Sequence, residues 1–153
     1  MKAPKPIAVV DTNVVIYLLG DERGKDFFFF RFGRSYDSKS VDDELVGHST
    51  RKKRKGLFRE MRAKIKDLRK EGLERCPVPA NHIRIEAEAI EASHPGFKGL
   101  GRGERDAIAQ VKVLQETDPD NQYVFVAADK RALRLGKSLG LEAIRYEEII
   151  EAG

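Results

Sequence analysis

Two aspartates each follow an apolar, β-branched segment of the kind that forms buried strands. Asp11 stands within IAVVDTNVVIYLL, and Asp129 follows YVFVAA. A lone buried carboxylate is costly unless something pairs with it. The carboxyl ends of parallel strands meet at one edge of a sheet, where α/β proteins bind their ligands. We therefore expect both carboxylates at that edge, with capping of the following helix as the alternative role of each.

A further pair of acids lies in GRGERDAIAQVKVL, directly after a glycine-rich loop over residues 94–103. On a helix with about 100° per residue, Glu104 falls on the same face as the apolar Ile108 and Val111. Asp106 is about 200° round the helix from Glu104, so the spacing alone directs it outward. Glu104 is therefore the preferred functional acid. Asp106 is either a second member of the site or a solvated acid favoured by the helix dipole.

Three adjacent acids occur in SVDDELVG. Ser40 and Asp43 have the spacing of a capping box, which predicts a helix that begins at residue 41. Asp42 and Asp43 then belong to the start of that helix. Glu44 lies on its inward side, so Glu44 is the preferred functional acid of the three.

Converging carboxylates repel one another unless a cation lies between them. Oxygen ligands alone suit Mg²⁺ or Mn²⁺, and the single cysteine and scattered histidines do not form a zinc set. Such ions activate a bound water and stabilise both the attacking and the leaving oxygen of a phosphodiester. The pattern therefore favours metal-dependent chemistry on phosphodiesters.

The elements that must position these acids alternate between strands and helices, which predicts an α/β fold with a parallel sheet covered on both faces. The clearest strands are 7–10 and 123–128. Helices are expected at 14–19, 26–36, 57–70, 80–92, 104–116, 130–139 and 147–151, and short strands at 76–78 and 142–145.

Length and composition suit one domain over residues 1–153. The chain is 41% hydrophobic and 35% charged, and no apolar run approaches the ~20 residues of a membrane span. The apolar segment near the N-terminus is too short for a signal peptide. A single cysteine, Cys76, forms no internal disulfide, which fits a reducing cytoplasm. A soluble cytoplasmic protein without a membrane partner is expected.

The charge is concentrated in a basic helical segment at about 51–70. This segment has eleven basic and two acidic residues, a net charge of +9, whereas the whole chain has +4. The segment is either a solvated helix face or a surface for a polyanion. Its first five residues are the candidate contacts: Arg51, Lys52, Lys53, Arg54 and Lys55. The aromatic run Phe27–Phe30 belongs either to the core or to a surface for a dimer, a partner or stacked bases.

Four motifs resemble those of PIN domains, in the same order: VVDTNVVI, the acid in DDEL, GERDAIA and FVAADKRAL. The resemblance spans about residues 7–146 and implies a three-layer α/β/α fold with a central, mainly parallel sheet. It implies a metal cluster of Asp11, Glu44, Glu104 and Asp129, with Asp106 as a further member, and Asn13 as the residue that orients Asp11. One departure is Ala127, where many members have Thr or Ser.

By this resemblance, the protein is a Mg²⁺- or Mn²⁺-dependent endoribonuclease that hydrolyses single-stranded RNA, either a toxin-type enzyme or an RNA-processing enzyme. The alternative is an RNA-binding PIN-like module with an incomplete site that does not cleave. The resemblance leaves open a homodimer and an antitoxin protein as partners. A haloacid-dehalogenase-type phosphotransferase is disfavoured, because Asn13 stands where that family needs a second Asp.

Overall fold

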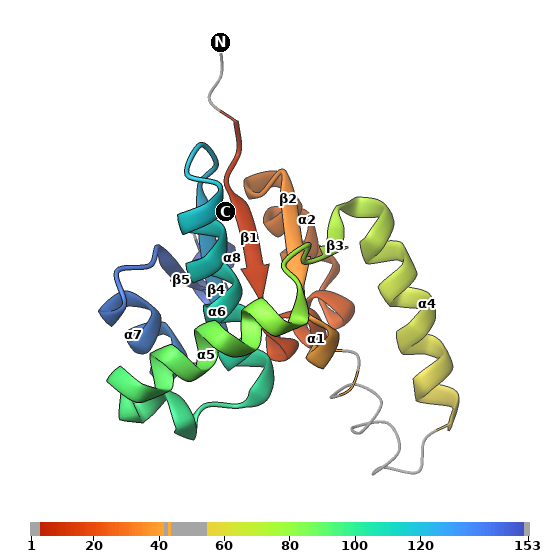
Figure 1. Ribbon diagram of the computed structural model, residues 1–153. Helices are drawn as coiled ribbons and strands as arrows, with labels where there is room; N and C mark the ends of the chain where they lie inside the picture. The colour runs from red at the N-terminus through yellow and green to blue at the C-terminus, as the bar shows by residue number, and fades with distance from the viewer. Residues whose placement is uncertain (1–3, 42, 44–54, 152–153) are drawn as a thin grey trace.

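The computed structural model describes residues 4–41, 43 and 55–151, with the backbone alone described at 55–61. In this part of the chain, five parallel strands form one sheet in the order β3-β2-β1-β4-β5 (Figure 1). The strands are β1 (Ile7–Val10), β2 (Arg34–Asp37), β3 (Leu73–Arg75), β4 (Tyr123–Ala127) and β5 (Ala143–Arg145). The expected parallel sheet is confirmed.

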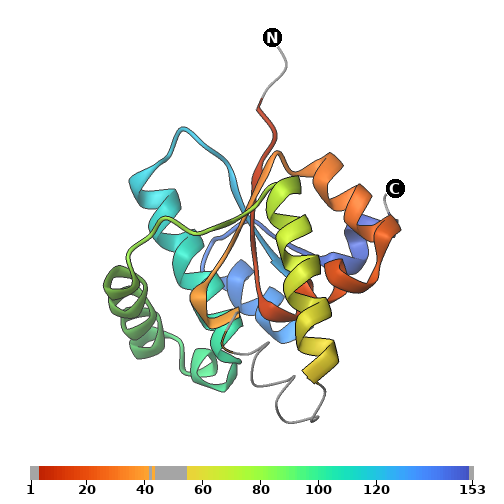
Figure 2. The same ribbon diagram turned by 90° about the vertical axis from the view of Figure 1, so that its right-hand side faces the viewer.

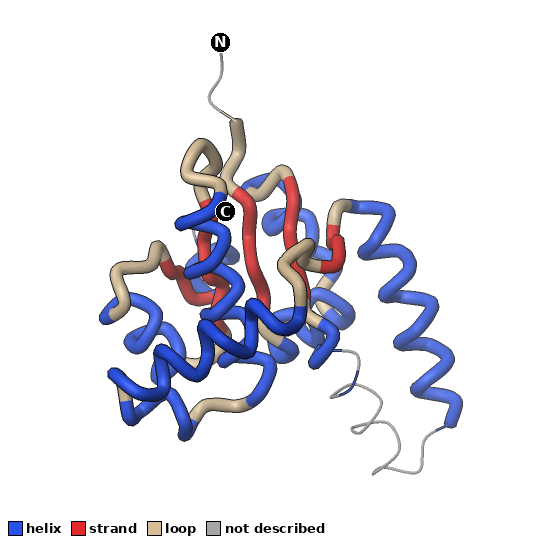
Figure 3. Tube along the Cα trace, viewed as in Figure 1, coloured by secondary structure: helices blue, strands red, loops and turns tan. Residues whose placement is uncertain are grey.

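Helices cover both faces of the sheet, which makes three layers (Figures 2 and 3). One face is covered by α1 (Thr12–Gly20), α2 (Glu22–Arg31), α4 (Lys55–Glu71) and α8 (Tyr146–Glu151). The other is covered by α5 (Ala80–Ser93), the 3₁₀ turn η1 (Pro95–Gly99), α6 (Arg102–Thr117) and α7 (Lys130–Ser138). Among the described residues, no helix is both long enough and apolar enough to span a membrane.

The two central strands are apolar because both of their faces are buried. Ile7 and Val9 of β1 pack on the α6 side, and Ala8 and Val10 pack on the α1 side. The residues of β4 alternate in the same way between the two core clusters. Side chains of successive strand residues point to opposite faces, so a strand between two helical layers is apolar at every position. This is why both strands are recognisable in the sequence.

The sequence prediction is wrong over residues 26–36, which were expected to form one helix. Helix α2 ends at Arg31, and residues 34–37 form β2 between β1 and β3. The sequence RSYD is too polar to indicate a buried strand, yet Ser35, Tyr36 and Asp37 are buried. The hydroxyl and the N–H of Ser35 both donate to the Gly72 carbonyl, at 3.2 and 3.0 Å. Hydrogen bonds thus accommodate the polar Ser35, whereas Tyr36 packs in the hydrophobic core.

Two element boundaries also differ from those predicted. The strand expected at 76–78 lies at Leu73–Arg75 instead, because Pro77 and Pro79 have no N–H to extend the pairing. Helical residues begin at 39 rather than 41, and the N–H of Val41 donates to the Ser38 carbonyl at 3.0 Å. Ser40 therefore lies inside the first turn and is not its cap.

The basic helix α4 is amphipathic, as its sequence indicates. Leu68 is fully buried against the sheet, Ile65 is half-buried, and Lys64 and Lys66 are exposed. The helix ends at Gly72, whose φ of 129° lies in a region that residues with a Cβ rarely adopt. The apolar residues Ile65 and Leu68 thus hold α4 against the sheet, while its exposed lysines face the solvent.

The aromatic run divides between the core and the surface. Phe28 and Phe32 are buried, and their ring centroids are 5.1 Å apart. Phe30 is 77% exposed, with the Lys5 ammonium 5.0 Å from its ring centroid. Core packing therefore explains Phe28 and Phe32 but not Phe30, and the homodimer stays a prediction.

Candidate functional site

Asp11 lies at the carboxyl end of β1, where the sequence prediction places it. Its side chain is 1% exposed and caps α1, with Oδ1 accepting the Val14 N–H at 2.9 Å. The capping role considered above is therefore present. It does not exclude a ligand, because a carboxylate has several lone-pair sites. Asn13, the predicted orienting residue, is exposed in the first turn of α1.

Asp129 stands two residues after β4 and is partly buried. It caps α7, with Oδ1 accepting the Arg131 N–H at 2.8 Å. Strand β4 pairs with β1, with Val10 opposite Val126, so Asp11 and Asp129 follow neighbouring parallel strands. The chain builds the sheet outward from β1 to β3 and then returns to place β4 on the other side of β1. Ligands of open α/β sheets bind at such reversals of strand order.

The two acids of α6 are both partly buried. Glu104 Oε1 accepts the Gly101 N–H at 3.1 Å and so closes a capping interaction at the start of the helix. Asp106 lines a cavity between α5 and α6, and its membership of the metal site stays a prediction. Helix α5 packs along α6 and gives α6 a second covered side, which a single helical wheel does not represent.

Several predicted site residues lie outside the described part of the chain. These are Glu44 and the basic residues Arg51, Lys52, Lys53 and Arg54, whereas Lys55 begins α4 with only its backbone described. The neighbouring Asp43 is described, and its Oδ2 lies 3.5 Å from Nη1 of Arg102. That ion pair connects the segment after β2 to the start of α6.

The donor chemistry of the predicted cluster fits Mg²⁺ or Mn²⁺, because every member is a carboxylate. Over residues 4–41, 43 and 55–151, however, no three acidic, histidine or cysteine side chains are grouped closely enough to hold a metal ion. The described residues alone therefore do not complete the predicted site. The metal and the full ligand set remain predictions.

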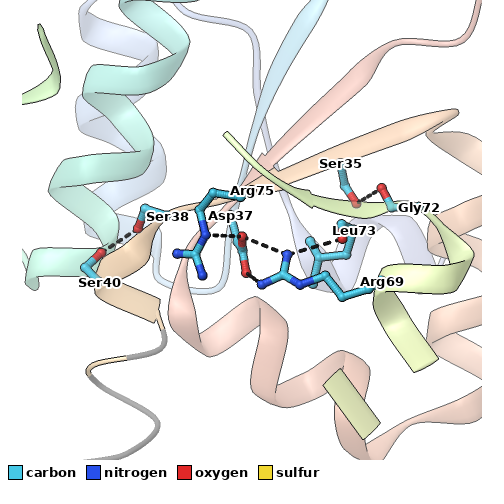
Figure 4. A network of polar contacts seen from close by, with 8 residues as sticks. All are labelled: Ser35, Asp37, Ser38, Ser40, Arg69, Gly72, Leu73 and Arg75. Atoms are coloured by element: carbon cyan, nitrogen blue, oxygen red, sulfur yellow. Dashed lines mark hydrogen bonds and ion pairs between the residues drawn. The ribbon is translucent and has the colours of Figure 1, made fainter. Parts of the chain in front are cut away.

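A buried carboxylate that the sequence prediction missed is Asp37, at the carboxyl end of β2 (Figure 4). Its two oxygens accept from Nη1 and Nη2 of Arg69, each at 3.0 Å, and Nε of Arg75 lies 3.8 Å from Oδ1. Arg69 also donates to the Leu73 carbonyl at 3.2 Å. A bidentate hydrogen-bonded pair of one arginine with one carboxylate is both strong and directional. Asp37 therefore ties α4 and β3 to β2.

Cys76 is adjacent to this cluster, and its N–H donates to the Asp37 carbonyl at 2.9 Å. Burial raises the pKa of its thiol to about 11, and the Asp37 charge raises that pKa further. The thiolate is the nucleophilic form of cysteine, so Cys76 is an inert, structural thiol at neutral pH.

The cavity at Asp106 has a volume of about 440 Å³. It is bounded by residues 38–40 after β2, by α5, by Phe97 and by the first turns of α6. Its lining combines apolar side chains with charged side chains of both signs. Its lining includes Ser38, which directly follows Asp37 at the end of β2, and the candidate ligand Asp106.

Two further buried polar groups were not foreseen. The Thr12 hydroxyl and both amide atoms of Gln110 have no hydrogen-bond partner among the described residues. Thr12 directly follows Asp11, whereas Gln110 is fully buried on α6, one turn beyond Asp106. In contrast, Ala127 is fully buried in the apolar cluster, so this chain has no hydroxyl at that position.

No protein-family model matches the chain, and no match is found among curated proteins. Among solved structures, the chain is similar to a PilT N-terminus (PIN) domain protein from the hyperthermophilic archaeon Sulfolobus solfataricus. The two chains are 16% identical with a TM-score of 0.50, and the match covers 95% of this chain and 92% of the other. At this level of identity the likeness concerns the fold. The fold is therefore a three-layer α/β/α arrangement of the PIN type.

Proposed function

We propose that this protein is a metal-dependent endoribonuclease that hydrolyses single-stranded RNA. The observation that supports this most directly is the pair Asp11 and Asp129, which follow neighbouring parallel strands where the strand order reverses. Glu104 and Asp106 at the start of α6 are partly buried, and α6 packs on β1 and β4. The PIN-type fold agrees with this assignment.

The residues that would hold Mg²⁺ or Mn²⁺ are Asp11, Glu44, Glu104 and Asp129, with Asp106 as a fifth candidate. When bound, such an ion lowers the pKa of a coordinated water and neutralises charge on the phosphate. Asn13 is the proposed orienting residue for Asp11.

The chain's own contacts keep two of these carboxylates in fixed orientations. Val14 and Arg131 donate backbone N–H groups to Asp11 and Asp129, respectively. Because each bond also caps a helix, neither side chain rotates without loss of that cap. A site held on strand ends and helix starts is more rigid than one built on loops.

The basic segment is proposed to bind the RNA backbone through Arg51, Lys52, Lys53, Arg54 and Lys55. Helix α4 extends this charge with the exposed side chains of Arg62, Lys64, Lys66 and Lys70. Single-stranded RNA releases counterions when its phosphates are neutralised, so binding should weaken steeply with salt. The assignment depends on charge density alone and implies no sequence preference.

The test is incubation of an end-labelled single-stranded RNA with the protein, with Mn²⁺, with Mg²⁺ and with EDTA. We expect internal cleavage that requires the metal and falls at least ~100-fold in Asp11→Asn. Asp26→Asn is the matched control, because Asp26 is an exposed aspartate in the neighbouring helix α2. Equal cleavage by wild type and Asp11→Asn would refute the proposed site.

The second candidate is an RNA-binding module of the same fold that does not cleave. It is favoured by Ala127, which leaves the site without a hydroxyl that many PIN domains have there, and by the incomplete acid grouping among the described residues. Binding of the same RNA without metal-dependent cleavage would support it. An antitoxin gene adjacent to this one would favour a toxin-type nuclease over a processing enzyme.

RNA binding is tested separately with two double variants, each of which removes two positive charges. The test variant is Arg51→Ala with Arg54→Ala, and the control variant is Arg134→Ala with Lys137→Ala on α7. Each lost phosphate contact lowers the slope of log affinity against log salt by about 0.7. We expect weaker binding and a shallower slope for the first pair only. If both double variants lower the affinity and the salt slope equally, RNA binds to positive charge at any place on the protein, and the proposed surface is wrong.

A further inference from the structure

The cavity between α5 and α6 offers a second binding place for the RNA of the proposed function, in addition to the strand-end acids. Helices α5 and α6 pack side by side, and Figure 1 shows α5 crossing the molecule near the carboxyl ends of the strands. Ser38 and Ser40 form one wall directly after β2, and Asp106 belongs to another. The cavity therefore lies between the segment that follows β2 and the start of α6.

The size and lining of the cavity suit one nucleotide. Its volume of about 440 Å³ lies within the roughly 300–1,000 Å³ of small-ligand sites. Ala80, Ile83, Ala87 and Phe97 supply apolar surface for a flat ring. Four cationic side chains and three carboxylates supply hydrogen-bond donors and acceptors: Lys39, Arg84, Arg102, Arg105, Glu88, Glu91 and Asp106.

The donors in this lining are not equivalent. Arg102 is paired with Asp43 at 3.5 Å, and Glu91 is paired with Lys98 at 3.7 Å. Arg105 is partly buried, and its Nε is a buried donor without a hydrogen-bond partner in the described part of the chain. Arg105 lines the cavity and forms no ion pair among the described residues, so the outer nitrogens of its guanidinium are available to donate to a ligand.

We propose that this cavity is a nucleobase subsite, and that Arg105 reads a guanine in the RNA strand next to the cleaved bond. An arginine presents two parallel donors that match the O6 and N7 acceptors of guanine. Cytosine also has two adjacent acceptors, O2 and N3, but it has no ring N–H for a carboxylate to accept. The carboxylate of Glu88 in the same lining accepts from the ring N–H and the amino group of guanine. Unstacked bases of single-stranded RNA are recognised by such edge contacts. The position of the base relative to the cleaved bond rests on the proposed nuclease function, whereas the binding of guanine does not.

Binding is measured first, without metal, so that cleavage plays no part. The probes are the four ribonucleoside 5′-monophosphates, titrated into the full-length protein by calorimetry. We expect guanosine monophosphate to bind at least about 10-fold more tightly than the other three. The preference should disappear in Arg105→Ala and should not return in Arg105→Lys, since lysine lacks the two-pronged donor.

Arg134→Ala is the matched control, since Arg134 is an exposed arginine on α7 and does not line the cavity. Arg105→Lys keeps the charge and the stem, so it serves as the variant if Arg105→Ala does not fold. Equal affinity for all four nucleotides overturns the subsite, as does a guanine preference that persists in folded Arg105→Ala or Arg105→Lys.

The same proteins then separate this proposal from the nuclease proposal. A guanine preference that depends on Arg105, without any metal-dependent cleavage, supports the subsite and overturns the nuclease. Cleavage that shows no preference for guanine near the cut, in wild type and Arg105→Ala alike, overturns the subsite and leaves the nuclease standing.

Discussion

Asp11 and Asp37 lie at the same edge of the sheet, one directly after β1 and the other at the end of the neighbouring β2. Both are 1% exposed. Asp11 accepts a backbone N–H from the helix that it caps. Asp37 instead accepts two hydrogen bonds from Arg69 and has Arg75 close by. The same residue type at the same edge is therefore held by a helix start in one case and by two cationic side chains in the other.

This difference shows that a strand-end position does not by itself define a functional carboxylate. The surrounding elements decide, because α4 and β3 bring Arg69 and Arg75 to Asp37, and Arg69 engages both of its oxygens. An arginine that occupies both oxygens compensates the buried charge within the fold. We therefore assign Asp37 to the structure and Asp11 to the proposed site.

The largest expected effect is that of Arg69→Ala, which leaves the buried Asp37 carboxylate without its two-pronged partner. Breaking a buried pair in this way lowers the free energy of unfolding by about 3–5 kcal/mol. Urea denaturation of wild type and variant measures this loss. The control is Arg34→Ala, whose ion pair with Glu74 at 3.4 Å is well exposed and is worth about 0–1 kcal/mol. A loss below about 1 kcal/mol in Arg69→Ala would show that Asp37 does not depend on it.

A smaller effect on stability is expected at Asp11. Asn caps helices about as well as Asp, whereas Ala removes the cap at a cost of about 1 kcal/mol. The free energy of unfolding of Asp11→Asn should therefore lie within about 0.5 kcal/mol of the wild-type value, and that of Asp11→Ala should be lower. Both variants should lose metal-dependent cleavage. If Asp11→Asn is as unstable as Arg69→Ala, the Asp11 charge serves the fold and the contrast with Asp37 is wrong.

The smallest effect concerns Cys76, beside Asp37. With a thiol pKa raised to about 11 from an ordinary 9.0, the native protein should resist iodoacetamide at pH 8. The raised pKa stabilises the fold below pH 9, and that contribution is lost as the pH rises from 9 through about 11, because the unfolded thiol ionises first. In Cys76→Ala, the free energy of unfolding should change less with pH over this range. Rapid labelling of folded protein at pH 8 would contradict the burial of the thiol.

The sequence predicts what is apolar and locally periodic. Strands β1 and β4 are apolar at every position, so their ends, and with them Asp11 and Asp129, are readable from the chain. Strand β2 is not, because RSYD is stabilised by pairing with strands that are distant in sequence. Asp37 was missed for that reason. The cavity beside Asp106 could not be predicted, because the packing of α5 on α6 is a tertiary contact that helical periodicity does not include.

The pairing of β1 with β4 has a consequence for the order in which the molecule is made. Val10 pairs with Val126, so the two strand-end acids of the proposed site come from segments that are synthesised at different times. Strand β1 has no β4 beside it until residues 123–127 have emerged, and pairing between strands that are distant in sequence forms late. Under the proposed function, activity would therefore begin only after β4 has paired with β1.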